Sequence, residues 1–156
     1  MRRISSVLLS TMLVGGVCAA TAGTAAGAER RADVRLTAAP STVEVPAGKA
    51  GTVTLTYSNV GNVPKEGSSI TAPIPAGLTA TARPAPGWTC HLDEWPSLIC
   101  ATEGTLAPGD VVTPAEVDLS AAVPVSARVE FGTLGFYRDP TENPADNYST
   151  VDVRIS

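Results

Sequence analysis

Apolar and polar residues alternate at every second position along much of this sequence, and that alternation limits the fold more than any other feature. Val53, Leu55 and Tyr57, for example, are interleaved with threonines. Successive side chains of a β-strand point to opposite faces, so this period is typical of strands that bury one face. Valine and threonine also favour strands. The clearest runs lie at 33–37, 43–45, 52–58, 116–121, 125–131 and 150–155.

Turn signals separate these runs. Proline and glycine interrupt the chain throughout, with 13 and 14 copies respectively, and no stretch has a convincing helical period. We therefore expect one all-β domain over 33–156, an antiparallel β-sandwich of about seven to eight short strands. The turn signals are Pro46-Ala47-Gly48, Asn59 to Asn62, Pro75-Ala76-Gly77, Ala107 to Asp110 and Asp139 to Asn147.

Composition excludes two broad classes of protein. The chain carries 11 Lys and Arg against 15 Asp and Glu, a net charge of -4. Nothing in that balance would neutralise phosphates, so a nucleic-acid partner is not expected. Apolar residues make up 44% of the chain, which argues against a fully disordered protein.

The first 28 residues have the order of regions found in a secretory signal peptide. Arg2 and Arg3 precede an apolar run from Val7 to Ala20, and small residues lead to Ala28, where we place cleavage. The run is short for a membrane span, which needs about 20 residues. Lipid attachment at Cys18 and an uncleaved anchor are the alternatives. We expect a secreted chain without a membrane span, and a flexible N-terminal tail at 29–32.

Removal of the leader leaves two cysteines, Cys90 and Cys100. An even pair in an oxidising compartment predicts a disulfide. Closing so short a loop should stabilise the fold by roughly 3 kcal/mol in the chain-entropy model. A metal site is the competing interpretation, but the spacing fits no CxxC motif and a lone His91 cannot complete a zinc shell.

Several landmarks occur in one order. They are Ala32-Asp33-Val34, Gly51 to Gly61, Ile74-Pro75-Ala76-Gly77-Leu78, Gly87-Trp88-Thr89-Cys90, Cys100, Gly104 to Gly109, Asp139-Pro140 and Asn143 to Asn147. Over nearly all of the mature chain this order resembles the bacterial secreted repeat family catalogued as "domain of unknown function 11".

The resemblance implies an Ig-like sandwich on the outside of bacteria, often repeated in long surface or adhesin-like proteins, with no catalytic residues. Three departures stand out. There is one copy rather than an array, and no C-terminal sorting signal or membrane anchor, so a stalk or covalent wall role is in doubt. The segment 91–99 between the cysteines is also bulkier and more charged than a plain hairpin needs.

That segment holds the candidate binding loop, which consists of His91, Asp93, Glu94 and Trp95. His91 is the only histidine and no Gly-x-Ser-x-Gly elbow is present, so a nucleophile triad is not expected. Asp93 and Glu94 are adjacent carboxylates, which a strand would point to opposite faces rather than to one bond. A solvated loop explains all three residues without catalysis.

The two tryptophans have different expected roles. Trp88 lies two positions before Cys90 and should pack in the core near the disulfide. Trp95 either presents a surface to a partner or folds back over the disulfide. A carbohydrate-binding module would need Trp95 to line up with Tyr137 and Tyr148. A protease inhibitor could instead present Trp95-Pro96-Ser97 on a disulfide loop.

Oxygen-bearing side chains cluster late in the chain. Asp139, Glu142 and Asp146, with Asn143 and Asn147, could supply calcium ligands. The spacing does not match an EF-hand, and asparagine and aspartate also favour turns by bonding their own backbone. A turn is therefore the preferred interpretation, and weak calcium binding is the alternative.

These observations favour a non-catalytic, secreted binding or structural module, associated with the cell envelope or with adhesion. No cofactor is expected. The partner would be a protein or a cell-wall glycan, bound through the loop with Trp95 or by strand pairing at a sheet edge. A small carbohydrate-binding module and a protease inhibitor are the alternative functions.

Overall fold

The computed structural model describes residues 30–133 and 143–156. The predicted signal peptide at 1–28 lies outside these residues. Eleven strands and one short 3₁₀ helix, η1 (Pro144–Asp146), make up the described fold. The strands are β1 (Val34–Ala39), β2 (Thr42–Val45), β3 (Ala50–Asn59), β4 (Lys65–Pro73), β5 (Thr79–Pro84), β6 (Thr89–Leu92), β7 (Ser97–Leu106), β8 (Val111–Val112), β9 (Ala115–Ser120), β10 (Val125–Thr133) and β11 (Tyr148–Ile155).

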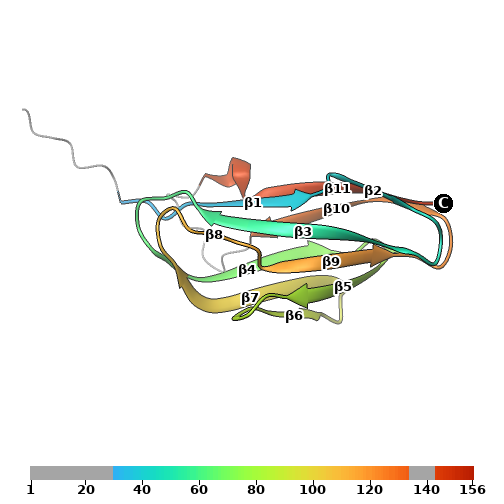
Figure 1. The fold of residues 1–156 in the computed structure, drawn as a ribbon, viewed down its shortest axis with the longest axis horizontal. Coiled ribbons are helices and arrows are strands. Elements are labelled where there is room, and N and C mark those ends of the chain that lie inside the picture. The colour runs from blue at the N-terminus through green and yellow to red at the C-terminus, as the bar shows by residue number, and fades with distance from the viewer. Residues whose placement is uncertain (1–29, 134–142) are drawn as a thin grey trace, which may run out of the picture.

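The strands form two sheets that pack face to face as a sandwich (Figure 1). One sheet has the order β1-β3-β9-β5, with the two-residue β8 paired to β3. The other has the order β2-β11-β10-β4-β7-β6. The predicted all-β sandwich is therefore confirmed. Strand pairing is antiparallel except between β2 and β11, which run parallel.

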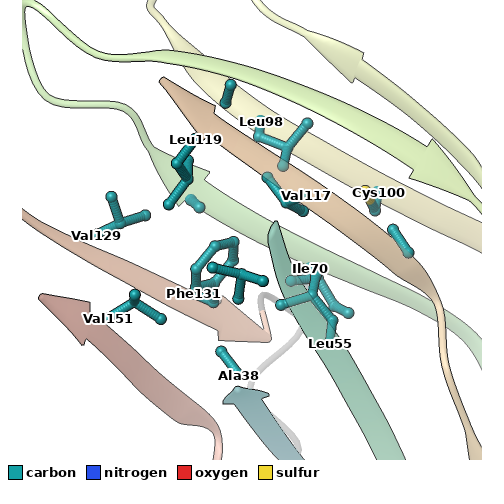
Figure 2. Close-up of a cluster of buried hydrophobic side chains, with 14 of the residues drawn as sticks. Ala38, Leu55, Ile70, Leu98, Cys100, Val117, Leu119, Val129, Phe131 and Val151 are labelled. Atoms are coloured by element: carbon teal, nitrogen blue, oxygen red, sulfur yellow. The ribbon is translucent and has the colours of Figure 1, made fainter. Parts of the chain in front are cut away.

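The core lies between the sheets and follows the alternation in the sequence. On β3, Val53, Leu55 and Tyr57 are buried, whereas the threonines between them are at least partly exposed. Phe131 of β10 faces them from the other sheet. In Figure 2 side chains from both layers converge there, among them Leu55, Val117 and Leu119 from one sheet and Ile70, Val129 and Val151 from the other.

The structure has more strands than the alternation alone indicated. Between residues 65 and 106 it places four strands, β4 to β7, where the sequence shows no clear period of two. On β4 the pattern is hidden because Lys65 to Ser69 include no apolar side chain. A register shift also lies there, between Glu66 and Ser68, where Gly67 adopts a positive φ of 58°. The pairing advances by two residues on β4, from Glu66 to Ser68, and by three on β7, from Thr105 to Thr102, so the extra residue of this bulge lies on β7.

The predicted tail at 29–32 contains an anchored residue. The Arg31 N–H donates to the side-chain oxygen of Asn62 at 2.7 Å, and the Asn62 N–H donates back to the Arg31 carbonyl at 2.9 Å. Arg31 also forms an ion pair with Asp33. The chain is therefore tied to the β3–β4 connection from Arg31 onward.

The chain passes from one sheet to the other along each long side of the sandwich. The β1–β2 connection crosses on one side, and the segment 85–88 between β5 and β6 crosses on the other. Consequently β5 and β6 are the last strands of their sheets and lie at the same side of the molecule (Figure 1). This side positions the candidate site.

The same substitution should have very different effects in the core and at this side. Leu55 is 0% exposed, whereas Leu92 of β6 is 50% exposed. Leu55→Ala should lower the free energy of unfolding by about 2–5 kcal/mol, because it removes buried methyl groups and leaves a cavity. Leu92→Ala should cost less than half as much. Equal losses in urea unfolding would contradict the assigned core.

Candidate functional site

The site is a β-hairpin formed by β6 and the first half of β7. Thr89 pairs with Ala101, Cys90 with Cys100, His91 with Ile99 and Leu92 with Leu98. A turn at Ala85–Trp88 leads into β6, with Gly87 at a φ of 82° and the Trp88 N–H bonded to the Ala85 carbonyl. At the tip, the Asp93 N–H donates to the Ser97 carbonyl at 3.0 Å.

A disulfide joins the two strands of this hairpin. Cys90 and Cys100 are directly opposite one another, with 4.1 Å between their Cα atoms. The predicted disulfide is therefore present. Cys100 is buried and Cys90 packs against the core, so the link fixes β6 to the edge of the sandwich.

The segment between the cysteines is a hairpin and not the extended loop that the sequence suggested. His91 and Leu92 belong to β6, and Ser97 to Ile99 belong to β7, which is paired on both sides. The turn itself is only Asp93 to Pro96. The long disulfide loop expected for a protease inhibitor is thus absent, because strand pairing occupies most of the segment.

The four candidate residues all face solvent. His91, Asp93 and Glu94 are exposed, and Trp95 at the tip is 83% exposed. The Asp93 carboxylate accepts from the Glu94 N–H at 2.6 Å, which shapes the turn. Within the described parts of the chain, the imidazole of His91 takes part in no hydrogen bond or ion pair, and only its backbone pairs with Ile99. Because its side chain is so exposed, Trp95 does not fold back over the disulfide.

The other aromatic residues are placed apart from Trp95. Trp88 packs against the core and meets Tyr57 edge to face, with 5.9 Å between ring centroids. Its predicted core position is confirmed. Tyr148 starts β11 and covers Gly132, four strands away from β6, or about 19 Å at the usual strand spacing. Tyr137 lies outside the described residues. The sugar-stacking row of Trp95 and Tyr148 does not form.

A shallow apolar pocket lies beside the hairpin, between the two sheet edges. Its volume is about 230 Å³. One wall is β5, with Ala80, Thr81 and Ala82, and the other is the hairpin, with the disulfide at Cys90. The pocket is not predictable from the sequence, because its two walls belong to different sheets. Its only trace in the sequence is Ala80-Thr81-Ala82, and three residues are too few to define a period.

Carboxylates dominate the charge on β9, the strand that pairs with the pocket strand β5. Arg83 of β5 donates to Glu116 at 3.0 Å and also forms an ion pair with Asp118 on the neighbouring β9. The Thr52 hydroxyl donates to Asp118 as well, at 2.7 Å. These hydrogen bonds, the one from Arg83 first, hold the pKa of Asp118 below its ordinary value of 3.8. The guanidinium is therefore already compensated.

The candidate calcium residues are only partly described. Asp139 and Glu142 lie outside the described residues. Asn143 caps η1 by accepting from the Ala145 N–H at 3.2 Å, and Asp146 forms an ion pair with Arg35 of β1. Across 30–133 and 143–156 no group of three histidine, cysteine or acidic side chains could hold a metal ion. The described half of the cluster is thus engaged in turn and ion-pair contacts.

No helix in the described part of the chain has both the length and the apolar character that crossing a membrane requires.

Comparison with known proteins identifies the fold. No protein-family model and no curated protein sequence matches the chain. Solved structures do match. A CARDB domain from Pyrococcus furiosus, in complex with di-metal ions, has a TM-score of 0.56 and 11% identity, with 81% of this chain and 94% of that chain covered. A chain of a type I cohesin–dockerin complex from Clostridium thermocellum has a TM-score of 0.51 and 8% identity, covering 82% and 96%.

A third match is a cohesin from Acetivibrio cellulolyticus, solved in complex with a dockerin. It has a TM-score of 0.52 and 16% identity, covering 80% of this chain and 97% of that chain. The likeness is one of fold. It confirms the Ig-like sandwich, and at these identities it assigns neither a ligand nor a partner.

Removal of the disulfide should destabilise the protein without removing its core. The double variant Cys90→Ala/Cys100→Ala should lose about 3 kcal/mol of unfolding free energy, because its unfolded state is no longer constrained by the loop. Unfolding in guanidinium with and without dithiothreitol measures this. Reductant should weaken the wild type and leave the variant unaffected. A wild type insensitive to reductant would contradict the structural role of the disulfide.

Stability should also depend on Asp118 in acid. The pKa of Asp118 is lower in the folded protein than its ordinary value of 3.8. The ionised carboxylate therefore contributes fully to the free energy of unfolding above pH 3.8, and this contribution is lost as the pH falls through the folded pKa. Asp118→Asn should therefore flatten the acid limb of a thermal-melting series, and Thr52→Val should flatten it less. An unchanged acid limb in Asp118→Asn would show that the Arg83 pair does not persist in solution.

Proposed function

We propose that this chain is a secreted, non-catalytic module that binds a partner protein through the β6–β7 hairpin. The observation that carries the proposal is Trp95, which is 83% exposed at the tip of a disulfide-linked turn. An aromatic side chain of this size gains much more from burial against a partner than from contact with water. Tryptophan is also enriched among the residues that dominate binding energies.

The bracing of the hairpin supports a binding role. The disulfide and the pairing of β7 with β4 hold the turn before any partner arrives. A side chain presented on an ordered turn loses little conformational freedom on binding, so more of the contact energy is retained. Neighbouring Asp93 and Glu94 add charge that can select among partners.

The proposed location outside the cell has independent support. A disulfide persists in oxidising compartments and is rare in the cytosol, and Cys90 and Cys100 are bonded. The first 28 residues have the pattern of a signal peptide. The resemblance to the secreted Ig-like repeat family agrees with both, and we propose that the chain is a single copy of that repeat, associated with the bacterial envelope or with adhesion.

Proteins with this fold include modules that work by binding other proteins. The cohesins matched here were solved as complexes with dockerins. The site itself also favours binding over catalysis, because His91 stands without a carboxylate or serine partner among the described residues. The proposal extends the binding of a protein partner to the present chain, through its β6–β7 hairpin.

Trp95→Ala should abolish partner capture while leaving the fold intact. The purified chain, crosslinked in culture medium of the producing bacterium, should capture a protein that the variant does not capture. Val111→Ala is the matched control, since Val111 is a similarly exposed apolar residue of β8. Circular dichroism and melting should be unchanged in both variants, because neither side chain is in the core.

The polysaccharide alternative is tested on the same material. Wild-type protein is incubated with chitin, cellulose and purified cell wall. Retention that Trp95→Ala removes would show a glycan-binding module and overturn the protein-binding proposal. Equal protein capture by wild type and Trp95→Ala would remove the hairpin tip from the proposal.

A further inference from the structure

The strand β6 ends its sheet with one side unpaired. Its neighbour is β7, and no other strand in the described part of the chain pairs with it. In an antiparallel pair, residues alternate between hydrogen-bonded and non-hydrogen-bonded positions. The phase of that alternation decides which backbone groups of β6 face the open side.

Two observations fix this phase. The Asp93 N–H donates to the Ser97 carbonyl, which makes 93 and 97 a bonded position. Bonded positions recur at every second residue, so the backbone groups of His91 and Thr89 are also bonded to β7. The Cα separation of 4.1 Å at Cys90 and Cys100 agrees, because non-bonded pairs are the closer ones, at about 4.5 Å. The backbone N–H and C=O groups of Cys90 and Leu92 therefore point away from β7, toward the open edge.

The other edges of the sandwich are protected. On β1, the outward Ala38 N–H is bonded to the Ser149 hydroxyl at 2.9 Å. Pro40 and Pro46 flank β2, and β5 ends in Pro84 and carries Arg83. Proline and inward contacts of this kind prevent further strand pairing. In contrast, β6 contains no proline, lysine, arginine or register shift.

The open edge of β6 lies next to the apolar pocket. Residues directly opposite one another on neighbouring strands point to the same face of a sheet. A strand added antiparallel to β6 would therefore direct the residues opposite Cys90 and Leu92 toward the pocket wall formed by Ala80, Ala82 and Leu98. These side chains are small or apolar, and Leu92 is half exposed. Apolar residues of the added strand would cover the exposed half of Leu92.

The charges around β6 favour a basic occupant. Exposed Asp93 and Glu94 follow β6, and exposed Glu103 lies on β7. Among the described residues on this side, Arg83 is the single guanidinium, and it forms ion pairs with two carboxylates, Glu116 and Asp118. A residue opposite Asp93 would lie on the outer face, where an opposite charge stabilises a cross-strand pair.

We propose that β6 accepts an extended segment of the partner protein as an additional antiparallel strand. The segment carries apolar residues at two alternating positions, which enter the pocket, and lysine or arginine at the positions between them. Backbone groups of Cys90 and Leu92 supply the main-chain hydrogen bonds, and the pocket and carboxylates supply selectivity. This inference rests on the proposed function, because it names how the partner binds the same hairpin.

The probe is a capped nine-residue peptide, Thr-Lys-Val-Lys-Leu-Lys-Val-Lys-Thr. We expect saturable binding with a Kd below about 1 mM, with amide shifts of Cys90 and Leu92 in ¹⁵N spectra larger than those of residues on β2. A peptide of the same charge with serine and threonine in place of valine and leucine should bind at least about tenfold more weakly. So should the parent peptide N-methylated at its valine and leucine amides.

Two variants of one residue separate backbone pairing from side-chain contact. Leu92→Pro removes an outward N–H that β7 does not use, whereas Leu92→Ala shortens the side chain and keeps that N–H. Leu92→Pro should weaken peptide binding about tenfold or more, and Leu92→Ala should weaken it less. If Leu92→Pro fails to fold, the N-methylated peptide makes the same comparison on the unaltered protein.

The inference is overturned by absence of binding at 1 mM peptide, by equal affinity for the N-methylated peptide, or by equal affinity for the serine and threonine peptide. Sedimentation of the protein alone tests a second copy as the occupant. A dimer lost in Leu92→Pro would replace the partner segment with β6 of another molecule. If Trp95→Ala removes protein capture and Leu92→Pro does not, this inference is wrong and the proposed function stands.

Discussion

The burial of every second side chain between two sheets determines the rest of this structure. Leu55, Val117 and Phe131 are fully buried because each strand keeps its register with its neighbours. A slip of one residue would turn a whole apolar face to water. The interior side chains are therefore occupied by packing and do not take part in recognition. Recognition is left to the turns, the outer faces and the sheet edges, and the hairpin of β6 and β7 combines a turn with an edge.

The disulfide stabilises β6, an edge strand that its own backbone pairing holds only weakly. A strand of four residues with one neighbour has few backbone hydrogen bonds to hold it, and Leu92 at its end is only half buried. The link from Cys90 to buried Cys100 supplies the missing constraint. The edge can then remain open and apolar, next to the pocket against β5, without fraying. Acidic residues at the tip and along β9 keep the exposed side soluble and give it a preferred sign of charge.

The fold was predictable from the sequence where the alternation is clean. Val53, Leu55 and Tyr57 on β3, and Val151, Val153 and Ile155 on β11, are buried as their period of two requires. The disulfide also follows from the even number of cysteines that remain in a secreted chain, and the core position of Trp88 follows from its spacing to Cys90. Strand β4 was not predictable in this way, because Lys65 to Ser69 include no apolar side chain that could mark the period.

The candidate site was harder to predict than the fold. The sequence predicts solvated positions for His91, Asp93 and Glu94 and leaves Trp95 open between exposure and packing over the disulfide, but it places all four in a loop. A loop and a hairpin differ in the pairing of Ile99 with both His91 and Thr71, which is a contact between distant parts of the chain. The pocket depends on Ala80 and Ala82 from another sheet. No local pattern reports such an arrangement.

The central claim is that β6 is a disulfide-held strand whose outer side is open. Amide hydrogen exchange of the free protein tests it most directly, residue by residue along 89–92. The account predicts alternation, with slow exchange at Thr89 and His91, which bond to β7, and fast exchange at Cys90 and Leu92. Equal protection at all four amides, or the reverse alternation, would contradict it.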